Sequence, residues 1–130
     1  MKKILLLLAT AYSLAACDDF FEKDISRETV NIVAPVHEAI VPEGEITFCW
    51  DILEGAQRYR LVVVTPSFDK ANAAVCDLLI MPDSAAVSCA HTERLGAGNY
   101  EWSLWGLSST GTGKESVYAI SVSETTEGSD

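Results

Sequence analysis

Few residues of this sequence have the types and spacing that catalysis or metal binding requires. The two histidines, His37 and His91, lie far apart in the sequence, and neither belongs to a pair at metal-ligand spacing. No serine lies in a Gly-x-Ser-x-Gly elbow, and the acidic residues are scattered over turns and chain ends rather than paired. The sequence therefore predicts no enzymatic activity, no metal site and no cofactor.

Cys17 comes at the end of an N-terminal export signal. Residues 1–16 contain two lysines, then an apolar stretch that begins at Ile4, then small residues, which is typical of a secretory signal peptide. A membrane-spanning helix needs about 20 predominantly apolar residues, and Asp18 follows too early for that. We therefore expect residues 1–16 to be a signal peptide and not a membrane span.

The residues around Cys17 also predict a lipid anchor. Leu-Ala-Ala-Cys at residues 14–17 resembles the lipobox of bacterial lipoproteins, which implies lipidation of Cys17 and cleavage just before it. The acidic stretch at residues 17–24 resembles the export tag of surface lipoproteins of Bacteroidota-type bacteria. Together these resemblances imply an outer-membrane, lipid-anchored protein exposed at the cell surface. The alternative to lipidation is an ordinary signal peptide with a chance cysteine. The alternative to an export tag is an acidic tether without an export role.

The charge of the chain argues against one class of partner. The 130 residues contain 9 basic and 19 acidic residues, for a net charge of −10. Loss of the signal peptide removes two lysines and makes the net charge about −12, which disfavours anionic partners. Nucleic-acid binding requires clustered lysine and arginine, so we exclude it. The remainder of the chain has the size of one domain, which we expect to be monomeric.

The rest of the sequence has the period-two alternation of short β-strands, with turn residues between them. A tether at residues 17–28, a β-sandwich at 29–123 and a polar tail at 124–130 are the predicted regions. An all-β, antiparallel two-sheet sandwich of about seven strands accommodates this pattern. We expect strands at residues 28–36, 44–52, 56–66, 73–81, 84–91, 98–106 and 115–123.

A resemblance to a known fold family supports this interpretation. The segments "TFCWDILEGAQRYRLVV" and "LGAGNYEWSLWG" resemble fibronectin type III or immunoglobulin-like modules of Bacteroidota-type surface lipoproteins. The resemblance implies an immunoglobulin-like fold, and its marker residues are structural rather than functional. They are Phe48, Trp50, Gly55, Ala56, Tyr59, Leu95, Gly98, Tyr100 and Trp102. We expect Trp50 to fill the core and the Tyr100 hydroxyl to bond to backbone a few residues upstream, as in a tyrosine corner.

The three cysteines after Cys17 leave the disulfide pattern open. Their number is odd, so at least one thiol is free or intermolecular. Cys49 with Cys89 and Cys76 with Cys89 are the candidate pairs, and three free thiols are the favoured outcome. Alternation places Cys49 away from the core and Cys89 toward it.

One outer sheet face is the candidate binding surface. If Tyr59 and its alternate neighbours point inward, then Arg58, Arg60, Val62 and Val64 point outward, and Trp105 of a neighbouring strand joins them. Tryptophan and arginine are enriched at binding hot spots. In the alternative, Arg58 or Arg60 covers the Trp105 ring by a cation–π contact and closes the surface.

These inferences predict a non-enzymatic outer-membrane surface lipoprotein. We expect it to act as a binding or adhesion module for a glycan or a protein, attached to the membrane through its lipid. The alternative is a structural or assembly accessory of a larger outer-membrane complex.

Overall fold

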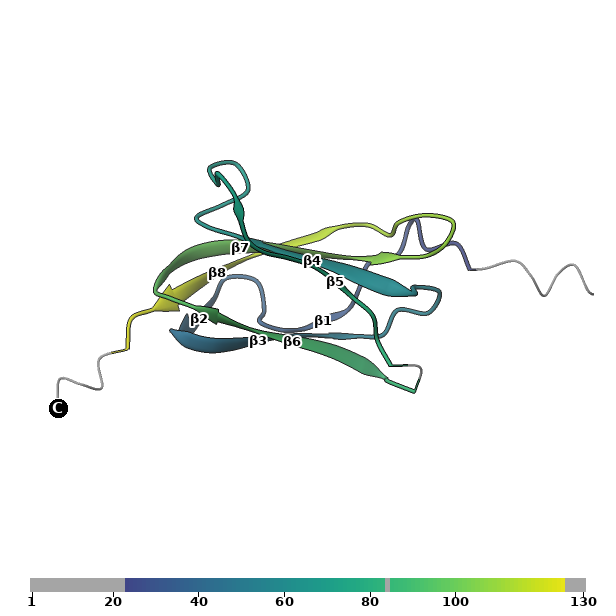
Figure 1. Cartoon of the computed structure of the whole chain (residues 1–130), viewed down its shortest axis with the longest axis horizontal. Coiled ribbons are helices and arrows are strands. Elements are labelled where there is room, and N and C mark those ends of the chain that lie inside the picture. The colour runs from purple at the N-terminus through teal and green to yellow at the C-terminus, as the bar shows by residue number, and fades with distance from the viewer. Residues whose placement is uncertain (1–22, 84, 126–130) are drawn as a thin grey trace, which may run out of the picture.

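The structure, a computed structural model, describes residues 23–83 and 85–125 and contains two β-sheets packed face to face (Figure 1). One sheet has the strand order β1–β3–β6, and the other has the order β2–β8–β7–β4–β5. The predicted all-β sandwich is confirmed. The strands are β1 (Ile32–Ala34), β2 (Ala39–Pro42), β3 (Gly44–Asp51), β4 (Arg58–Val64), β5 (Ala74–Ile80), β6 (Ser88–Leu95), β7 (Gly98–Leu107) and β8 (Ser116–Ser123).

Aromatic rings from both sheets form the centre of the core. Phe48 packs edge-on against Trp102 with ring centroids 4.9 Å apart, and Trp50 packs in the same way against Tyr59 at 5.6 Å. Burial of all four side chains is complete, as the alternation predicted for these strands. The Tyr59 hydroxyl accepts a hydrogen bond of 2.8 Å from the Leu53 backbone N–H, so its polar end has a partner inside the fold.

The strand β2 was not predicted. The expected strand at 28–36 is shorter and ends before Pro35, which has no N–H to donate to a ladder. The chain then crosses to the other sheet, where β2 pairs in parallel with β8. The sandwich therefore has eight strands instead of seven and is not wholly antiparallel. Four residues are too few for their alternation to be recognised in the sequence.

The strand β6 lies four residues further along the chain than predicted. We expected a strand at 84–91, but β6 runs from Ser88 to Leu95 and pairs with β3 over its whole length. Its inward positions include His91 and Glu93, which are half-buried. Two polar residues at inward positions hide the alternation that a sequence pattern relies on.

Tyr100 forms the predicted tyrosine corner. Its hydroxyl donates a hydrogen bond of 2.8 Å to the backbone carbonyl of Gly96. The backbone N–H of Ala97 donates to the Glu43 carboxylate at 3.3 Å, so the turn between β6 and β7 is tied to a second loop. Gly98, with φ of 150°, adopts a conformation that favours glycine at the start of β7.

The segment before β1 packs against the sandwich. Ile25 is 1% exposed, although it lies in the stretch that we assigned to the tether. It packs beside Gly55 and Gly106, where a larger side chain would approach it closely. Backbone bonds from Glu28 to Ile25 and from Lys114 to Glu28 extend the contact. Packing against the domain therefore begins no later than Ile25.

Several predictions fall on residues outside the described part of the chain. These are the signal peptide at 1–16, lipidation of Cys17, the acidic stretch up to residue 22 and most of the tail at 124–130. Among residues 23–83 and 85–125, no helix is long and apolar enough to cross a membrane.

Candidate functional site

The outer face of the five-stranded sheet carries the predicted binding residues on neighbouring strands. Pairing of β4 with β7 places Arg60 directly opposite Trp105 and Val62 opposite Ser103. Directly opposed residues of an antiparallel pair have Cβ atoms about 4.5–5.5 Å apart. Trp105 and Val62 are half-buried and Arg60 is exposed. The structure thus brings these three residues together on one face.

Exposed aliphatic side chains lie on the same face as Trp105, on β5 and β8. Leu79 of β5 lies opposite Arg60, and Val117 of β8 lies opposite Ser103. Leu79 is 51% exposed and Val117 is 46% exposed. We call Val62, Leu79, Trp105 and Val117 the Trp105 patch. It extends across four adjacent strands of the sheet.

Arg60 is held by a carboxylate on the side of β4 that faces away from Trp105. Its Nε and Nη2 donate hydrogen bonds of 2.8 Å each to the two carboxylate oxygens of Asp77 on β5. These bonds lower the pKa of Asp77 below its ordinary value. Because β5 and β7 flank β4 on opposite sides, the bonds draw the Arg60 guanidinium toward β5. The guanidinium is therefore held on the side of β4 away from the Trp105 ring.

Arg58 is placed differently from Arg60. It lies opposite Leu107, diagonally from Trp105, and is half-buried. Its Nε is buried and has no hydrogen-bond partner among the described residues. Cover of the Trp105 ring by Arg58 stays a prediction.

Val64 does not lie open on this face as predicted, since it is only 5% exposed. The connection between β4 and β5 projects from the sheet (Figure 1). The Phe68 backbone N–H donates to the carboxylate of Glu101, the cross-strand partner of Val64, at 2.7 Å. The expectation that Val64 is exposed on this face is therefore wrong, since the side chain is buried beside the loop that contacts Glu101.

The same loop bounds a shallow hollow of about 360 Å³ near β2. Polar groups and one exposed aliphatic side chain line most of it. The sequence did not reveal this hollow, although the alternation around Tyr100 and Trp102 placed Glu101 outward. The lining includes Glu38, Ile40, Ser67, Asn99, Glu101 and Ser121.

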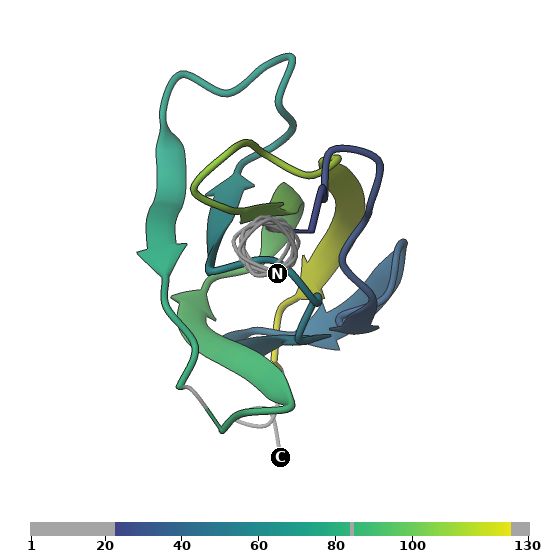
Figure 2. The same ribbon diagram turned by 90° about the vertical axis from the view of Figure 1, so that its right-hand side faces the viewer.

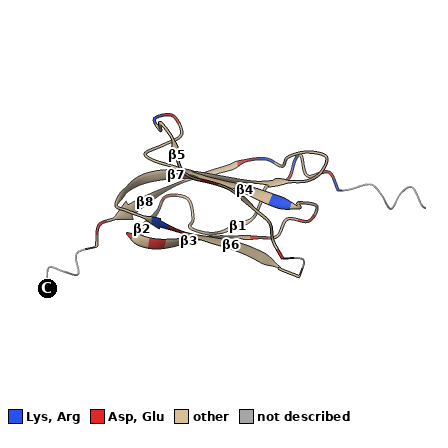
Figure 3. Ribbon diagram, in the orientation of Figure 1, with Lys and Arg blue, Asp and Glu red and all other residues tan. Residues whose placement is uncertain are grey.

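Charged side chains are dispersed over this domain. Figure 3 shows lysine and arginine interspersed with aspartate and glutamate along strands and loops of both layers, without a basic cluster among the described residues. Phosphate backbones bind to clustered cations, and the absence of nucleic-acid binding stays a prediction.

The three described cysteines are all free thiols, in agreement with the favoured expectation. Cys49 is half-buried and points away from the core, whereas Cys89 is buried, as alternation predicted. Burial, with a smaller contribution from the Glu93 carboxylate, raises the pKa of Cys76 to about 11. Burial also raises the pKa of Cys89. Both buried thiols are therefore protonated at neutral pH.

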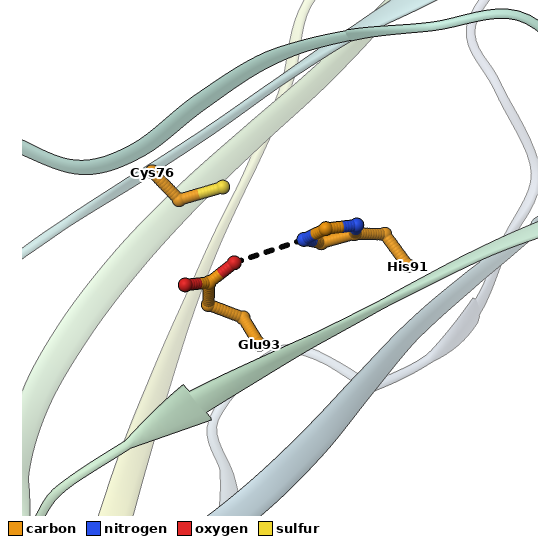
Figure 4. Close-up of side chains that lie close together, drawn as sticks. All are labelled: Cys76, His91 and Glu93. Carbon is orange, nitrogen blue, oxygen red and sulfur yellow. Dashed lines mark hydrogen bonds and ion pairs between the residues drawn. The ribbon is translucent and has the colours of Figure 1, made fainter.

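The two histidines occupy different environments. His37 is exposed, and its Nδ1 accepts a hydrogen bond of 3.0 Å from the Ala119 backbone N–H, which ties the loop before β2 to β8. His91 is half-buried, and its Nε2 lies 2.9 Å from a carboxylate oxygen of Glu93. Figure 4 shows the Cys76 thiol directed toward the same point. No pattern in the sequence indicated that this cysteine, on another strand, would approach His91.

Comparisons with known proteins yield similarity of fold alone. No protein-family model matches the chain, and no curated protein sequence matches it. Among solved structures, a mutant of FN3tt is similar with a TM-score of 0.48 and 15% identity, covering 75% of this chain and all of the other. A crystal structure of FN3tt has a TM-score of 0.46 and 10% identity, covering 72% of this chain and 95% of the other.

Proposed function

We propose that this protein is a non-enzymatic, lipid-anchored lipoprotein of the outer-membrane surface, and that its β-sandwich binds a ligand at the Trp105 patch. The observation that carries this proposal is the half-buried Trp105 ring on a sheet face that also carries exposed aliphatic side chains, beside an Arg60 guanidinium that Asp77 holds by two hydrogen bonds. The lipobox-like residues before Cys17 support attachment to the membrane.

A protein ligand suits the patch better than a glycan. Leu79 on β5 and Val117 on β8 add exposed aliphatic area to the face that carries Trp105, and apolar area on a surface is typical of protein interfaces. Tryptophan and arginine near the centre of such an area are the residue types that dominate protein binding energy. Glycan binding would rely on the Trp105 ring and the polar hollow near Glu101.

Binding to intact cells tests the proposal. The chain beginning at Asp18, labelled with a fluorophore, is applied to a panel of bacterial and mammalian cells. We expect retention on at least one cell type, loss of retention after protease treatment of the cells, and little change after periodate oxidation of their glycans. Sensitivity to periodate alone would assign a glycan ligand instead. Retention only by cells of the producing bacterium would favour an assembly role.

Two variants connect binding to the patch. Trp105→Ala should retain the fold and lose at least tenfold in affinity, because a tryptophan at the centre of an interface contributes about 2 kcal/mol or more. Val33→Ala is the matched control, since Val33 is exposed on β1 in the other sheet. Unchanged binding by Trp105→Ala, or equal losses in both variants, would show that the patch is not the binding surface.

A further inference from the structure

The side of the sandwich where β5 and β6 end the two sheets brings three metal-ligating side chains together. β5 is the last strand of the five-stranded sheet and β6 is the last strand of the three-stranded sheet. Viewed end-on, the two strands lie on the same side of the molecule (Figure 2). Cys76 points inward from β5, and His91 and Glu93 point inward from β6, two residues apart on one face. Two sheets thus contribute to one cluster.

The distances within this cluster are close to those of a metal site. The Cys76 Sγ, a ring nitrogen of His91 and a carboxylate oxygen of Glu93 all lie within 4.8 Å of one another. Zinc binds thiolate at about 2.3 Å and nitrogen or oxygen ligands at about 2.0–2.2 Å, so tetrahedral ligand atoms are roughly 3.4–3.6 Å apart. The His91 nitrogen and the Glu93 oxygen, 2.9 Å apart, would separate by roughly 0.5 Å, and any wider pair of ligand atoms would contract by at most about 1.2 Å. Side-chain rotation can supply movements of this size.

The polar groups of the cluster interact with one another. A hydrogen bond of 2.9 Å joins His91 and Glu93, and the Glu93 carboxylate also interacts with the Cys76 thiol. The His91 and Glu93 side chains are only 27% and 31% exposed, and polar groups at inward positions of a sandwich are costly without compensation. A bound cation would compensate the Glu93 carboxylate and use the histidine and the thiolate as ligands.

The geometry points to a divalent metal site formed by Cys76, His91 and Glu93, with Zn²⁺ as the ion that this ligand set suits and the two sheets joined through it. One thiolate, one imidazole and one carboxylate form a mixed ligand set that suits Zn²⁺ rather than Ca²⁺ or Mg²⁺. Water would take the fourth position. The site is a brace between β5 and β6, on the side where the connection at residues 81–87 joins the sheets.

Cobalt titration of the reduced, metal-free chain tests the site. The chain beginning at Asp18 contains every strand and all three ligands, and it lacks Cys17. We expect one Co²⁺ per chain, with thiolate-to-cobalt charge-transfer absorption and the d–d bands of a tetrahedral site, and displacement by one Zn²⁺. We also expect Zn²⁺ to raise the melting temperature by several degrees, because an ion that binds only the folded state stabilises it.

Matched variants assign the ligands. Cys76→Ser should abolish the charge-transfer band, and His91→Gln should weaken binding at least tenfold while the charge-transfer band persists at saturation. Cys49→Ser and His37→Gln are the controls, since neither residue belongs to the cluster, and both should bind as the unchanged chain does. Absence of the charge-transfer band in the unchanged chain, or an equal loss in Cys49→Ser, would overturn the proposal. If Cys76→Ser does not fold, His91→Gln and its control decide the question.

Discussion

Single hydrogen bonds at defined residues tie the turns of this sandwich to its sheets. The Tyr100 hydroxyl reaches Gly96, the Tyr59 hydroxyl reaches Leu53, and the His37 ring reaches Ala119. Each bond joins a strand to a turn or loop that lies outside the β-sheet hydrogen bonding. Loss of one such partner leaves a polar group without compensation, which costs more than the bond itself contributes.

Replacement of Tyr100 by phenylalanine measures the tyrosine corner. Tyr100→Phe removes the bond to the Gly96 carbonyl and should lower the free energy of unfolding by about 1 kcal/mol. Urea denaturation of the chain beginning at Asp18 gives this value. Tyr118→Phe is the control, because the Tyr118 ring packs against Trp102 and its hydroxyl has no hydrogen bond within residues 23–83 and 85–125. Equal stability of Tyr100→Phe and the unchanged chain would refute the corner.

The ion pair between Arg60 and Asp77 predicts a pH dependence. Its bonds lower the folded-state pKa of Asp77, so the stabilisation is present above the unfolded pKa of about 3.9 and is lost as the pH falls through the folded value. The melting temperature of Asp77→Asn should therefore be below that of the unchanged chain at neutral pH, and this difference should shrink on acidification below pH 4. High salt at neutral pH should reduce it too. A difference that grows on acidification would contradict this.

At the scale of elements, the connections decide which strand faces are accessible. The loop between β4 and β5 lies beside the buried Val64 and bounds the hollow near Glu101. The chain crosses between the sheets after β1, so β1 belongs to the three-stranded sheet and β2 to the five-stranded sheet. The segment around Ile25 covers the end of the sandwich near Gly55 and Gly106. The open face that remains is the central part of the five-stranded sheet, with the Trp105 patch.

Substitution of Gly55 tests whether packing of Ile25, in the segment before β1, stabilises the fold. Its φ is +95°, and a Cβ there would lie 2.9 Å from the Ile25 side chain. Gly55→Ala should therefore destabilise the fold by roughly 1–3 kcal/mol, from backbone strain and from displacement of Ile25. Gly111→Ala is the control, because a Cβ at Gly111 would have no atom within 4 Å. Similar urea midpoints for both variants would show that the segment does not need this glycine.

At the scale of the whole molecule, the two sheets enclose two thiols and leave one accessible. Cys76 and Cys89 are buried, and Cys49 is half-buried on the opposite side of its strand. Thiolates react with disulfide reagents, and burial raises the pKa of both enclosed thiols. Their reaction therefore requires the sandwich to open, so labelling rates report on opening of the whole fold.

Ellman's reagent should distinguish the three thiols in the metal-free chain beginning at Asp18. At neutral pH, with chelator present, we expect one thiol to react quickly and two to react slowly. All three should react at once in denaturant, where burial is lost. Cys49→Ser should remove the fast phase and leave the slow phase unchanged. A fast phase that accounts for all three thiols in the folded chain would mean that the sandwich is open at the edge between β5 and β6.

The sequence by itself determined the fold class and most of the core. Alternation in the central strands is a local property with a period of two, so it identified the inward faces of Tyr59 and Trp102 without knowledge of their neighbours. The same rule identified the outward faces of Arg60, Val62 and Trp105. It failed for β2, which is too short, and for β6, where His91 and Glu93 occupy inward positions.

Only the tertiary structure decided what those faces meet. Val64 is buried beside the loop that contacts Glu101, and the pairing of Arg60 with Asp77 depends on the register between β4 and β5. The approach of Cys76 to His91 and Glu93 depends on two strands in different sheets that end on the same side of the sandwich. These are contacts between distant parts of the chain, and a local pattern carries no information about which distant residues will meet.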